Sequence, residues 1–233
     1  MLYLENGNKL DINPRNLKIL GSGAFGTVLK INESKCLKIL DYNPVHYDID
    51  LLDKQEFLNK PSLIDKHMQI IKENEYKNLS KIYELYYDYK KRLGGYLQQY
   101  LEKGYYSIQD LTEEYILNSF LNLLESSKKL SNQHILLRDT NTYNTILTRE
   151  GVYLIDFDLY NYTTDYTVKE LVRINQTQII KLFNNLCLES LQYEGINNYV
   201  LQLYKLFNYE DNNRLTVFNN IIDKLSNRKV LVR

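Results

Sequence analysis

The chain has 233 residues, 44% hydrophobic and 25% charged, which is the composition of an ordinary folded protein and argues against intrinsic disorder. Its 29 basic and 29 acidic residues give a formal net charge of zero, which argues against a generally cationic nucleic-acid binder. The first residues lack the basic and apolar regions of a secretory signal and no apolar run is long enough to cross a membrane, so we expect a cytoplasmic protein.

The first hundred residues carry the pattern of a β-sheet, because short apolar runs alternate with Gly, Asn and Ser. The expected strands cover residues 17–20, 27–31, 36–40, 82–89 and 96–101. We expect the pair Gly94-Gly95 to form the turn between the last two of these strands. Helices are expected over 48–60 and 62–77, because Pro61 suits the start of a helix better than its middle.

After Gly104 the pattern becomes helical, with apolar residues between Leu111 and Leu124 at steps of three and four. Two strands are expected at 145–147 and 152–155, and further helices from about Val168 onward. The expected fold class is therefore α+β. It has a β-rich part, a short connector and a mostly helical part, which cover residues 1–98, 99–103 and 104–233.

Residues 21–28 form a glycine-rich loop between the first two expected strands, with the sequence Gly-Ser-Gly-Ala-Phe-Gly-Thr-Val. Glycines let the backbone turn tightly and approach a phosphate without a clashing side chain. A dinucleotide-binding fold would need a helix directly after the loop, and a Walker loop would need Gly-Lys-Ser/Thr. The loop thus indicates either a phosphate-binding hairpin or a plain hairpin turn.

Lys38 stands inside the apolar run 36–40. An ammonium in such a strand must meet an anion or reach water, since an unpaired buried charge is costly. A nucleotide phosphate beneath the glycine loop would supply the anion, and the alternative is a position on the solvated face of an edge strand.

Three polar residues follow in the helical part. Asp139 and Asn144 are five residues apart in an expected loop, and Asp156 ends the apolar strand that comes later. Mg²⁺ prefers oxygen ligands, so Asn144 and Asp156 are candidate metal ligands, and Asp139 would be free to accept a proton from a hydroxyl. The Asp-x-x-x-x-Asn spacing alone carries little weight. The order of all these features, each in its expected context, carries more.

In this order the residues resemble the eukaryotic-like protein kinase superfamily. The glycine loop matches through Val28, and Cys36-Leu37-Lys38 matches the lysine-bearing strand. Residues 137–144 resemble the catalytic loop without its histidine, and residues 156–158 resemble Asp-Phe-Gly with Asp158 in place of the glycine. The resemblance implies one two-lobed kinase-like domain over 1–233, whose hinge is the connector 99–103.

The resemblance also implies the roles of individual residues. Asp139 and Lys38 would be catalytic, and Asn144 and Asp156 would hold Mg²⁺. Gln98 would be the gatekeeper, and the main chain of Gln99 and Leu101 would bind the base. ATP would be held by Gly21, Ser22, Gly23, Ala24, Phe25, Gly26, Val28, Lys38, Gln99, Leu101, Asn144 and Asp156. The possible helix partner of Lys38 is Glu56, with Glu73 and Glu75 as competitors.

Several departures leave the acceptor open. Asn141 stands where Ser/Thr kinases commonly have a lysine, the segment after Asp156 is short, and no Ala-Pro-Glu occurs. The short segment and Asp-Phe-Asp also resemble the aminoglycoside and choline kinases. We therefore keep three interpretations. The favoured one is a Ser/Thr protein-kinase-like enzyme, and the others are a small-molecule kinase and a nucleotide-binding pseudokinase or interaction module. The expected partners are ATP and a protein or small-molecule hydroxyl acceptor, with no nucleic acid and no membrane.

The remaining metal-ligand residue types give no site. His46, His67 and His134 lack metal-ligand spacing and are expected to be structural. Cys36 and Cys187 are too few for a disulfide framework, so we expect free thiols.

Overall fold

The computed structural model describes residues 2–4, 8, 10, 16–23, 26–40, 61–88, 91–195 and 197–207. Its strands are β1 (Tyr3–Leu4), β2 (Lys18–Gly23), β3 (Gly26–Lys30), β4 (Lys35–Leu40), β5 (Ile82–Tyr87), β6 (Leu93–Gln99), β7 (Ile135–Leu136), β8 (Thr145–Thr148), β9 (Gly151–Leu154) and β10 (Asn161–Tyr162). Its helices are α2 (Pro61–Glu73), α3 (Glu113–Asn132), α4 (Val168–Tyr193) and α5 (Asn198–Phe207), with 3-10 turns η3 (Ile108–Asp110) and η4 (Thr142–Asn144). The expected α+β class is confirmed.

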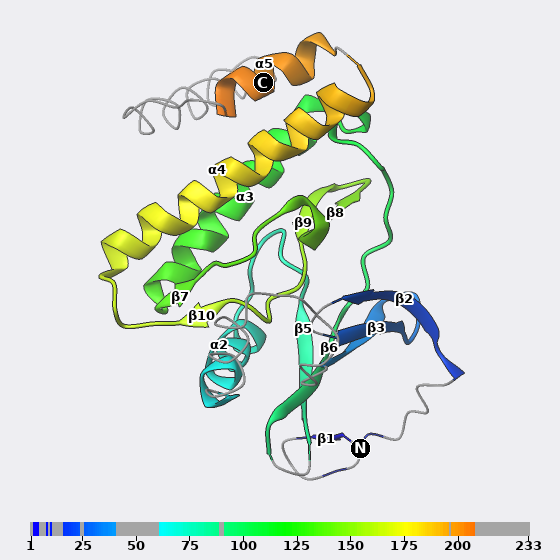
Figure 1. The fold of residues 1–233 in the computed structure, drawn as a ribbon, viewed down its shortest axis with the longest axis vertical. Helices are drawn as coiled ribbons and strands as arrows, with labels where there is room; N and C mark the ends of the chain where they lie inside the picture. The colour runs from blue at the N-terminus through cyan, green and yellow to red at the C-terminus, as the bar shows by residue number, and fades with distance from the viewer. Residues whose placement is uncertain are drawn as a thin grey trace, which may run out of the picture.

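Six strands form one antiparallel sheet in the order β1-β5-β6-β4-β3-β2, at the lower end of the molecule in Figure 1. Residues directly opposite each other on paired strands face the same side of a sheet. One such row runs through Gly21, Val28, Lys38, Tyr96 and Leu85. The register therefore puts Lys38 and the glycine-rich strand on one face of the sheet.

The two faces of the sheet bury different partners. Tyr96 and Leu85 belong to the main apolar core, which also includes residues of α2, α3 and α4. Leu37 and Leu97, one residue further along their strands, belong to a small separate cluster with N-terminal leucines. This alternation with a period of two is the expected consequence of strand geometry. It turns the Lys38 face toward the helical part of the chain.

The pair Gly94-Gly95 was expected as a turn, and this expectation is wrong. Both glycines lie inside β6, and the chain reverses earlier, where Lys91 N–H donates to the Asp88 carbonyl. A Cβ on Gly95 would lie 2.5 Å from the main-chain oxygen of Lys38. The glycine thus allows close approach of β4 and β6, and glycine within a strand often has this meaning.

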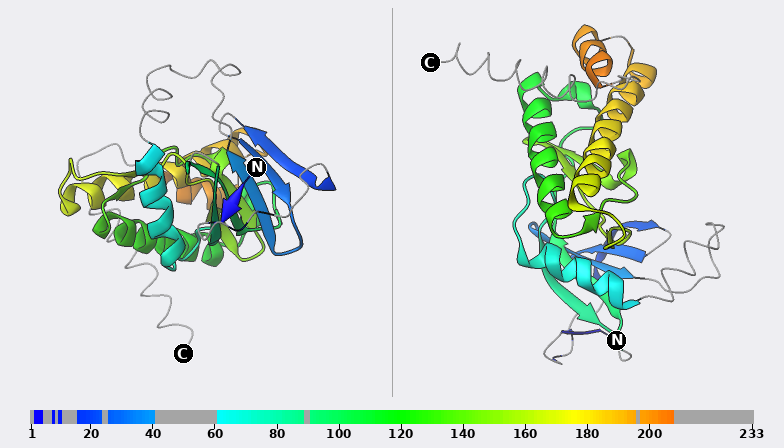
Figure 2. Two further views of the ribbon diagram at one scale, coloured as in Figure 1. Left: turned by 90° about the horizontal axis from the view of Figure 1, so that it is seen from below. Right: turned by 90° about the vertical axis from the view of Figure 1, so that its left-hand side faces the viewer.

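The helical part is built on α3 and α4, which lie side by side with α5 at one end (Figures 1 and 2). The side chain of Thr112 caps the N-terminus of α3, and Thr167 and Glu170 form a capping box at α4. Both helices begin close to the positions that the sequence indicates. The expected helix over 48–60 lies outside the described residues, and the expected helix over 62–77 ends at Glu73.

Polar contacts around Asn78 join the sheet to the helical part. Asn78 donates from Nδ2 to the carbonyl of Val152 at 2.9 Å and accepts from Asn122 of α3 at 2.9 Å. The main chain of Leu154 donates to the carbonyl of Asn78 at 2.9 Å, while Ser80 N–H donates to the carbonyl of Leu154 at 2.9 Å. The segment before β5 thus holds the end of β9, two residues before Asp156.

Within the described part of the chain, none of the helices has the length and apolar character needed to cross a lipid bilayer.

Candidate functional site

Lys38 of β4 is nearly enclosed, with only 5% of its side chain exposed. Its ammonium forms ion pairs with the carboxylates of Asp156 and Asp158, which follow β9. The lysine and its partners are more than a hundred residues apart in sequence, so the sheet and the β8-β9 hairpin must be docked for the pairs to form. The buried ammonium thus meets anions, as its position in an apolar strand requires.

One ammonium and two carboxylates leave an excess of negative charge when all three are ionised. Burial raises the pKa of the Asp158 carboxyl and the nearby charge of Asp156 adds to the increase, whereas the Lys38 ammonium opposes it. The two carboxylates raise the pKa of Lys38 although burial lowers it, so the amine stays protonated. A further cation near Asp156 would offset the remaining negative charge.

Asp139 is held by two asparagine side chains. Asn144 Nδ2 donates to the carboxylate at 2.8 Å and to the main-chain carbonyl of Asp139 at 2.9 Å, and Asn141 Nδ2 donates to the other carboxylate oxygen at 2.6 Å. The carboxylate remains exposed to solvent. It is therefore fixed in direction and accessible to an acceptor molecule.

Asn141 occupies the place where the resembled family commonly has a lysine. Its Oδ1 accepts from the main-chain N–H of Asn144 at 3.0 Å, so it caps the turn η4. The carbonyl of Asn141 accepts from the hydroxyl of Thr145 at 2.8 Å. This position thus shapes the loop around Asp139 and contributes no positive charge.

The loop of Asp139 and the segment of Asp156 lie next to each other. Ile155 N–H donates to the carbonyl of Asn144 at 3.0 Å, one residue before Asp156. Burial raises the pKa of Tyr160, a hydrogen bond with Thr140 opposes the increase, and the charges of Asp156 and Asp139 add to it. Asp139, Asn144, Asp156 and Lys38 thus belong to one continuous region.

Asp139 and Asp156 both adopt left-handed backbone conformations, with φ of 52° and 64°. Asparagine and aspartate visit this region more readily than other non-glycine residues, but it remains uncommon. Such conformations persist where the surroundings hold them, and they are frequent at functional sites.

The glycine loop forms the hairpin between β2 and β3, where Gly23 lies opposite Gly26. A Cβ added to Gly21 or Gly23 would meet no atom of the described residues within 4 Å, so open space borders both in that part of the structure. A Cβ on Gly26 would lie 2.1 Å from the carbonyl oxygen of Ile39. Gly26 thus has a packing role, whereas packing in this structure does not explain Gly21 and Gly23. Ala24 and Phe25 lie outside the described residues.

The expected hinge follows β6. The main-chain N–H of Gln99 donates to the carbonyl of Lys81 at 2.7 Å, and its carbonyl accepts from the Ser80 hydroxyl at 3.0 Å. Both main-chain groups of Gln99 are therefore engaged by the segment before β5. Leu101 is half-buried, and Gln98 is buried within β6.

The helix partner expected for Lys38 is not found among the described residues. Glu56 lies outside them, Glu73 is exposed at the end of α2, and Glu75 pairs with Lys81 at 3.3 Å. The helix α2 instead directs His67 Nε2 to the main-chain carbonyl of Phe157 at 2.9 Å. This contact ties α2 to the segment that carries Asp156 and Asp158.

Sequence reasoning missed two residues that shape the site. Asp158 appeared only as a departure from glycine, and because it lies in the loop after β9 its spacing from Asp156 gave no signal of a shared direction. Asn175 of α4 is fully buried and accepts from Leu137 N–H at 2.9 Å while it donates to the carbonyl of Ile135 at 2.8 Å. A single asparagine in this asparagine-rich chain gave no signal.

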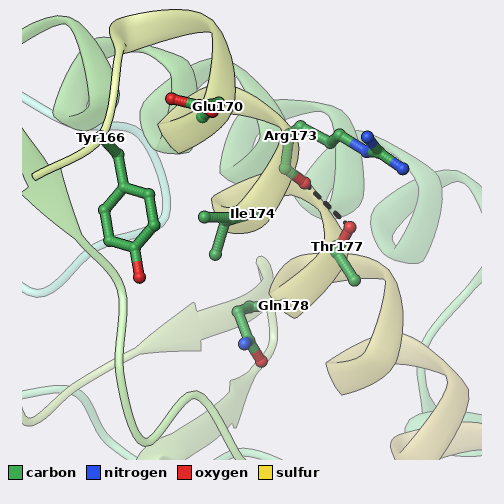
Figure 3. Close-up of a pocket in the computed structure, with 6 residues that line it drawn as sticks. All are labelled: Tyr166, Glu170, Arg173, Ile174, Thr177 and Gln178. Atoms are coloured by element: carbon green, nitrogen blue, oxygen red, sulfur yellow. Dashed lines mark hydrogen bonds between the residues drawn. The ribbon is translucent and has the colours of Figure 1, made fainter.

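A pocket of about 340 Å³ lies beside the first half of α4 and contains none of the predicted site residues. In Figure 3 the side chains of Tyr166, Ile174 and Gln178 border it, whereas the guanidinium of Arg173 points away from Tyr166. Glu170 is engaged in the capping box of α4, and the Thr177 hydroxyl donates to the carbonyl of Arg173 at 2.8 Å. Two of the polar side chains that line this pocket are thus already engaged within α4 and its cap.

The residues around Asp156 fit Mg²⁺ by their chemistry. Asp156 presents a carboxylate with a side chain 33% exposed, and Asn144 donates to Asp139 through its amide nitrogen, which leaves its amide oxygen for a cation. Oxygen donors of these two kinds, together with phosphate oxygens and water, are the usual ligands of Mg²⁺.

Comparison with known proteins gives one distant likeness. No protein-family model matches the chain. It is 28% identical over 139 residues to the meiosis-specific serine/threonine-protein kinase MEK1 of Saccharomyces cerevisiae. The match covers 56% of this chain and 27% of the yeast protein. The chain is thus distantly similar to part of a serine/threonine protein kinase, in agreement with the family that its motifs resemble.

Proposed function

We propose that the chain is an ATP- and Mg²⁺-dependent phosphotransferase with a two-lobed, protein-kinase-like fold. Residues 1–98 form its β-rich lobe, 99–103 its hinge and 104–233 its reduced helical lobe. It transfers the γ-phosphate of ATP to a hydroxyl, and a serine or threonine side chain of a protein is the favoured acceptor. The distant likeness to a yeast kinase supports this proposal.

The observation that carries the proposal is the ion pair between Lys38 and Asp156 beside the Asp139–Asn144 loop. An ammonium on the sheet and oxygen donors on the helical part face one region. The ammonium suits a nucleotide phosphate, and the oxygen donors suit the metal that accompanies it. A structural ion pair alone would not need the clamped and exposed carboxylate of Asp139. The open space around Gly21 and Gly23 adds support for a phosphate beneath the loop.

In the proposed reaction, Asp139 accepts the proton of the acceptor hydroxyl. The hydroxyl oxygen forms a bond to the γ-phosphorus, and the bond from that phosphorus to the β,γ-bridging oxygen breaks, so ADP leaves with the electron pair. Lys38 holds the phosphates that are not transferred. Asn144 and Asp156 would hold Mg²⁺, which would supply positive charge to offset the negative charge on the phosphoryl oxygens.

A small-molecule acceptor is the second candidate, favoured by the segment between Asp158 and α4. This segment is short, Tyr160 is buried within it, and Thr163 N–H donates to the carbonyl of His134 at 2.8 Å. Little of the chain is left there to display a peptide. A compact alcohol needs no such display surface.

The test is incubation with γ-labelled ATP and Mg²⁺ of the wild type and of Asp139→Asn. We expect Asp139→Asn to keep ATP binding and lose transfer. Label on protein supports the first acceptor class, and a labelled small product supports the second. If the wild type binds ATP but transfers no phosphate, the result supports the third interpretation, a nucleotide-binding pseudokinase or interaction module.

The metal assignment has its own test. ATP at one hundred times its dissociation constant stabilises a protein by about 2.7 kcal/mol, so Mg²⁺ with ATP should raise the melting temperature. Asp156→Ala should remove this metal-dependent increase, while the exposed Asp165→Asn should keep it. An unchanged increase in Asp156→Ala would contradict the assignment.

A further inference from the structure

The two carboxylates on Lys38 differ in their access to solvent. The side chain of Asp156 is 33% exposed, whereas that of Asp158 is 1% exposed. A ligand that enters from solvent can therefore reach Asp156, but it cannot reach Asp158 without a rearrangement. The two residues are thus suited to different tasks.

We propose that Asp158 is the positioning residue of Lys38, the carboxylate that stays on the ammonium while Asp156 turns to the metal. This inference rests on the proposed function, because it concerns how Lys38 is aimed at the phosphates of ATP. The role of pairing with Lys38, which we expected for a glutamate on a helix, is thereby assigned to Asp158 of the Asp-Phe-Asp segment.

The geometry of an ammonium makes this division possible. Lys38 has three N–H donors. Its ammonium donates to Asp156 and forms ion pairs with both carboxylates, whereas the oxygens of Asp158 have no hydrogen-bond partner among the described residues. When Asp156 binds a cation, its negative charge is shared and its hold on Lys38 weakens. Asp158 then remains as the buried anion that pairs with the ammonium, and the donor released from Asp156 is free for a phosphate oxygen.

The helix α2 offers no competing carboxylate among the described residues. Asp65 accepts from the hydroxyl of Tyr87 at 2.7 Å, and Glu73 is exposed at the end of the helix. The contact from α2 to the site goes through His67 to the main chain of Phe157, between Asp156 and Asp158. The helix thus positions the segment, and the segment positions the lysine.

The test compares four variants in ATP- and Mg²⁺-dependent phosphate transfer: Asp158→Asn, Lys38→Met, the double variant, and the exposed Asp165→Asn as the control. We expect Asp158→Asn to lower kcat/KM for ATP about tenfold or more. In the Lys38→Met background the same change should have no further effect, because a residue that acts through Lys38 has nothing left to position. Asp165→Asn should stay within about twofold of the wild type.

A second measurement does not depend on activity. Lys38→Met leaves Asp158 buried without its cation, so adding Asp158→Asn should raise the urea midpoint of the Lys38→Met protein. Additive effects in this unfolding cycle would overturn the pairing itself. A transfer rate in Asp158→Asn equal to or above that of the wild type would overturn the positioning role, as would an equal loss in Asp165→Asn.

These outcomes are separate from a failure of the proposed function. If the wild type neither binds ATP with Mg²⁺ nor transfers phosphate, the proposed function is wrong and the positioning role is overturned with it. If the wild type transfers phosphate and Asp158→Asn transfers it at the same rate, the phosphotransferase proposal stands and the inference about Asp158 is wrong.

Discussion

The side-chain amide of Asn144 donates to Asp139 twice, to the carboxylate at 2.8 Å and to the main-chain carbonyl at 2.9 Å. Asn144 is the last residue of the turn η4, and Asn141 caps the start of this turn. The amide nitrogen of Asn144 thus orients Asp139, while its amide oxygen is available to a cation. One side chain joins the expected proton acceptor to the expected metal site.

Substitution of Asn144 should separate these two tasks. Asn144→Ala should abolish both the Mg²⁺-dependent increase in melting temperature with ATP and phosphate transfer. Asn144→Asp keeps an oxygen ligand but places a second carboxylate against Asp139, so it should keep part of the thermal shift and still lose transfer. Thermal melting and a γ-phosphate transfer assay measure the two effects. The exposed Asn132→Ala is the control, and a fully active Asn144→Ala would contradict the assignment.

The glycine loop allows a matched pair of alanine substitutions. Gly26 has φ of 151° and its Cβ would lie 2.1 Å from the Ile39 carbonyl, so Gly26→Ala should destabilise the protein by about 1–3 kcal/mol. Gly21 has free space around it, so Gly21→Ala should leave stability within about 0.5 kcal/mol.

The same pair tests whether the loop covers a phosphate. Gly21→Ala should weaken ATP binding several-fold although the protein remains as stable as the wild type, because the added methyl group enters the space that a phosphate would use. Urea unfolding and ATP titration measure the two effects. Unchanged ATP affinity in Gly21→Ala would support the plain hairpin turn.

Much of the sheet could be predicted from the sequence because its strands are short apolar runs between glycine and asparagine turns. The β2-β3-β4 segment and the β8-β9 hairpin follow this pattern closely. The pair Gly94-Gly95 misled because glycine serves both in turns and where two backbones approach closely. The close approach becomes visible only in the structure, where the main chain of Lys38 on the neighbouring strand leaves no room for a Cβ on Gly95.

The site could be predicted in its residue types but not in its pairing. The spacing of Asp139 and Asn144 within one loop indicated a local arrangement, and the structure brings the two side chains into contact. The partners of Lys38 depend on how the β9 end docks beneath the sheet, across more than a hundred residues. No local pattern encodes that contact, and Asp158 could not be assigned from it.

The two thiols should be unreactive in the folded protein. Burial raises the pKa of Cys187 to about 12 and also raises the pKa of Cys36, so little thiolate exists at pH 8. Both side chains are also buried, which limits access. A disulfide reagent at pH 8 should titrate neither thiol in the native chain and both after unfolding in guanidinium. Rapid titration of either thiol in the native protein would contradict the buried placement.

Asn175 should be essential to the stability of the Asp139 loop, because it satisfies the main chain on both sides of Leu136. It accepts from Leu137 N–H at 2.9 Å and donates to the Ile135 carbonyl at 2.8 Å and to the Ser131 hydroxyl at 2.9 Å. Asn175→Leu would remove this partner from the buried Leu137 N–H and Ile135 carbonyl, at a cost of about 2–4 kcal/mol in the free energy of unfolding, while the Ser131 hydroxyl would still donate to the carbonyl of Ser127.

Gln176→Leu is the control for this prediction, because it also replaces a side-chain amide with leucine on the same helix, but at a half-buried position. It should change the free energy of unfolding by less than about 1 kcal/mol. Urea denaturation of both variants measures the difference. Since Leu137 lies two residues before Asp139, Asn175→Leu should also lower phosphate transfer at temperatures where the protein is still folded. Equal unfolding midpoints for the two variants would show that the buried amide does not hold the loop.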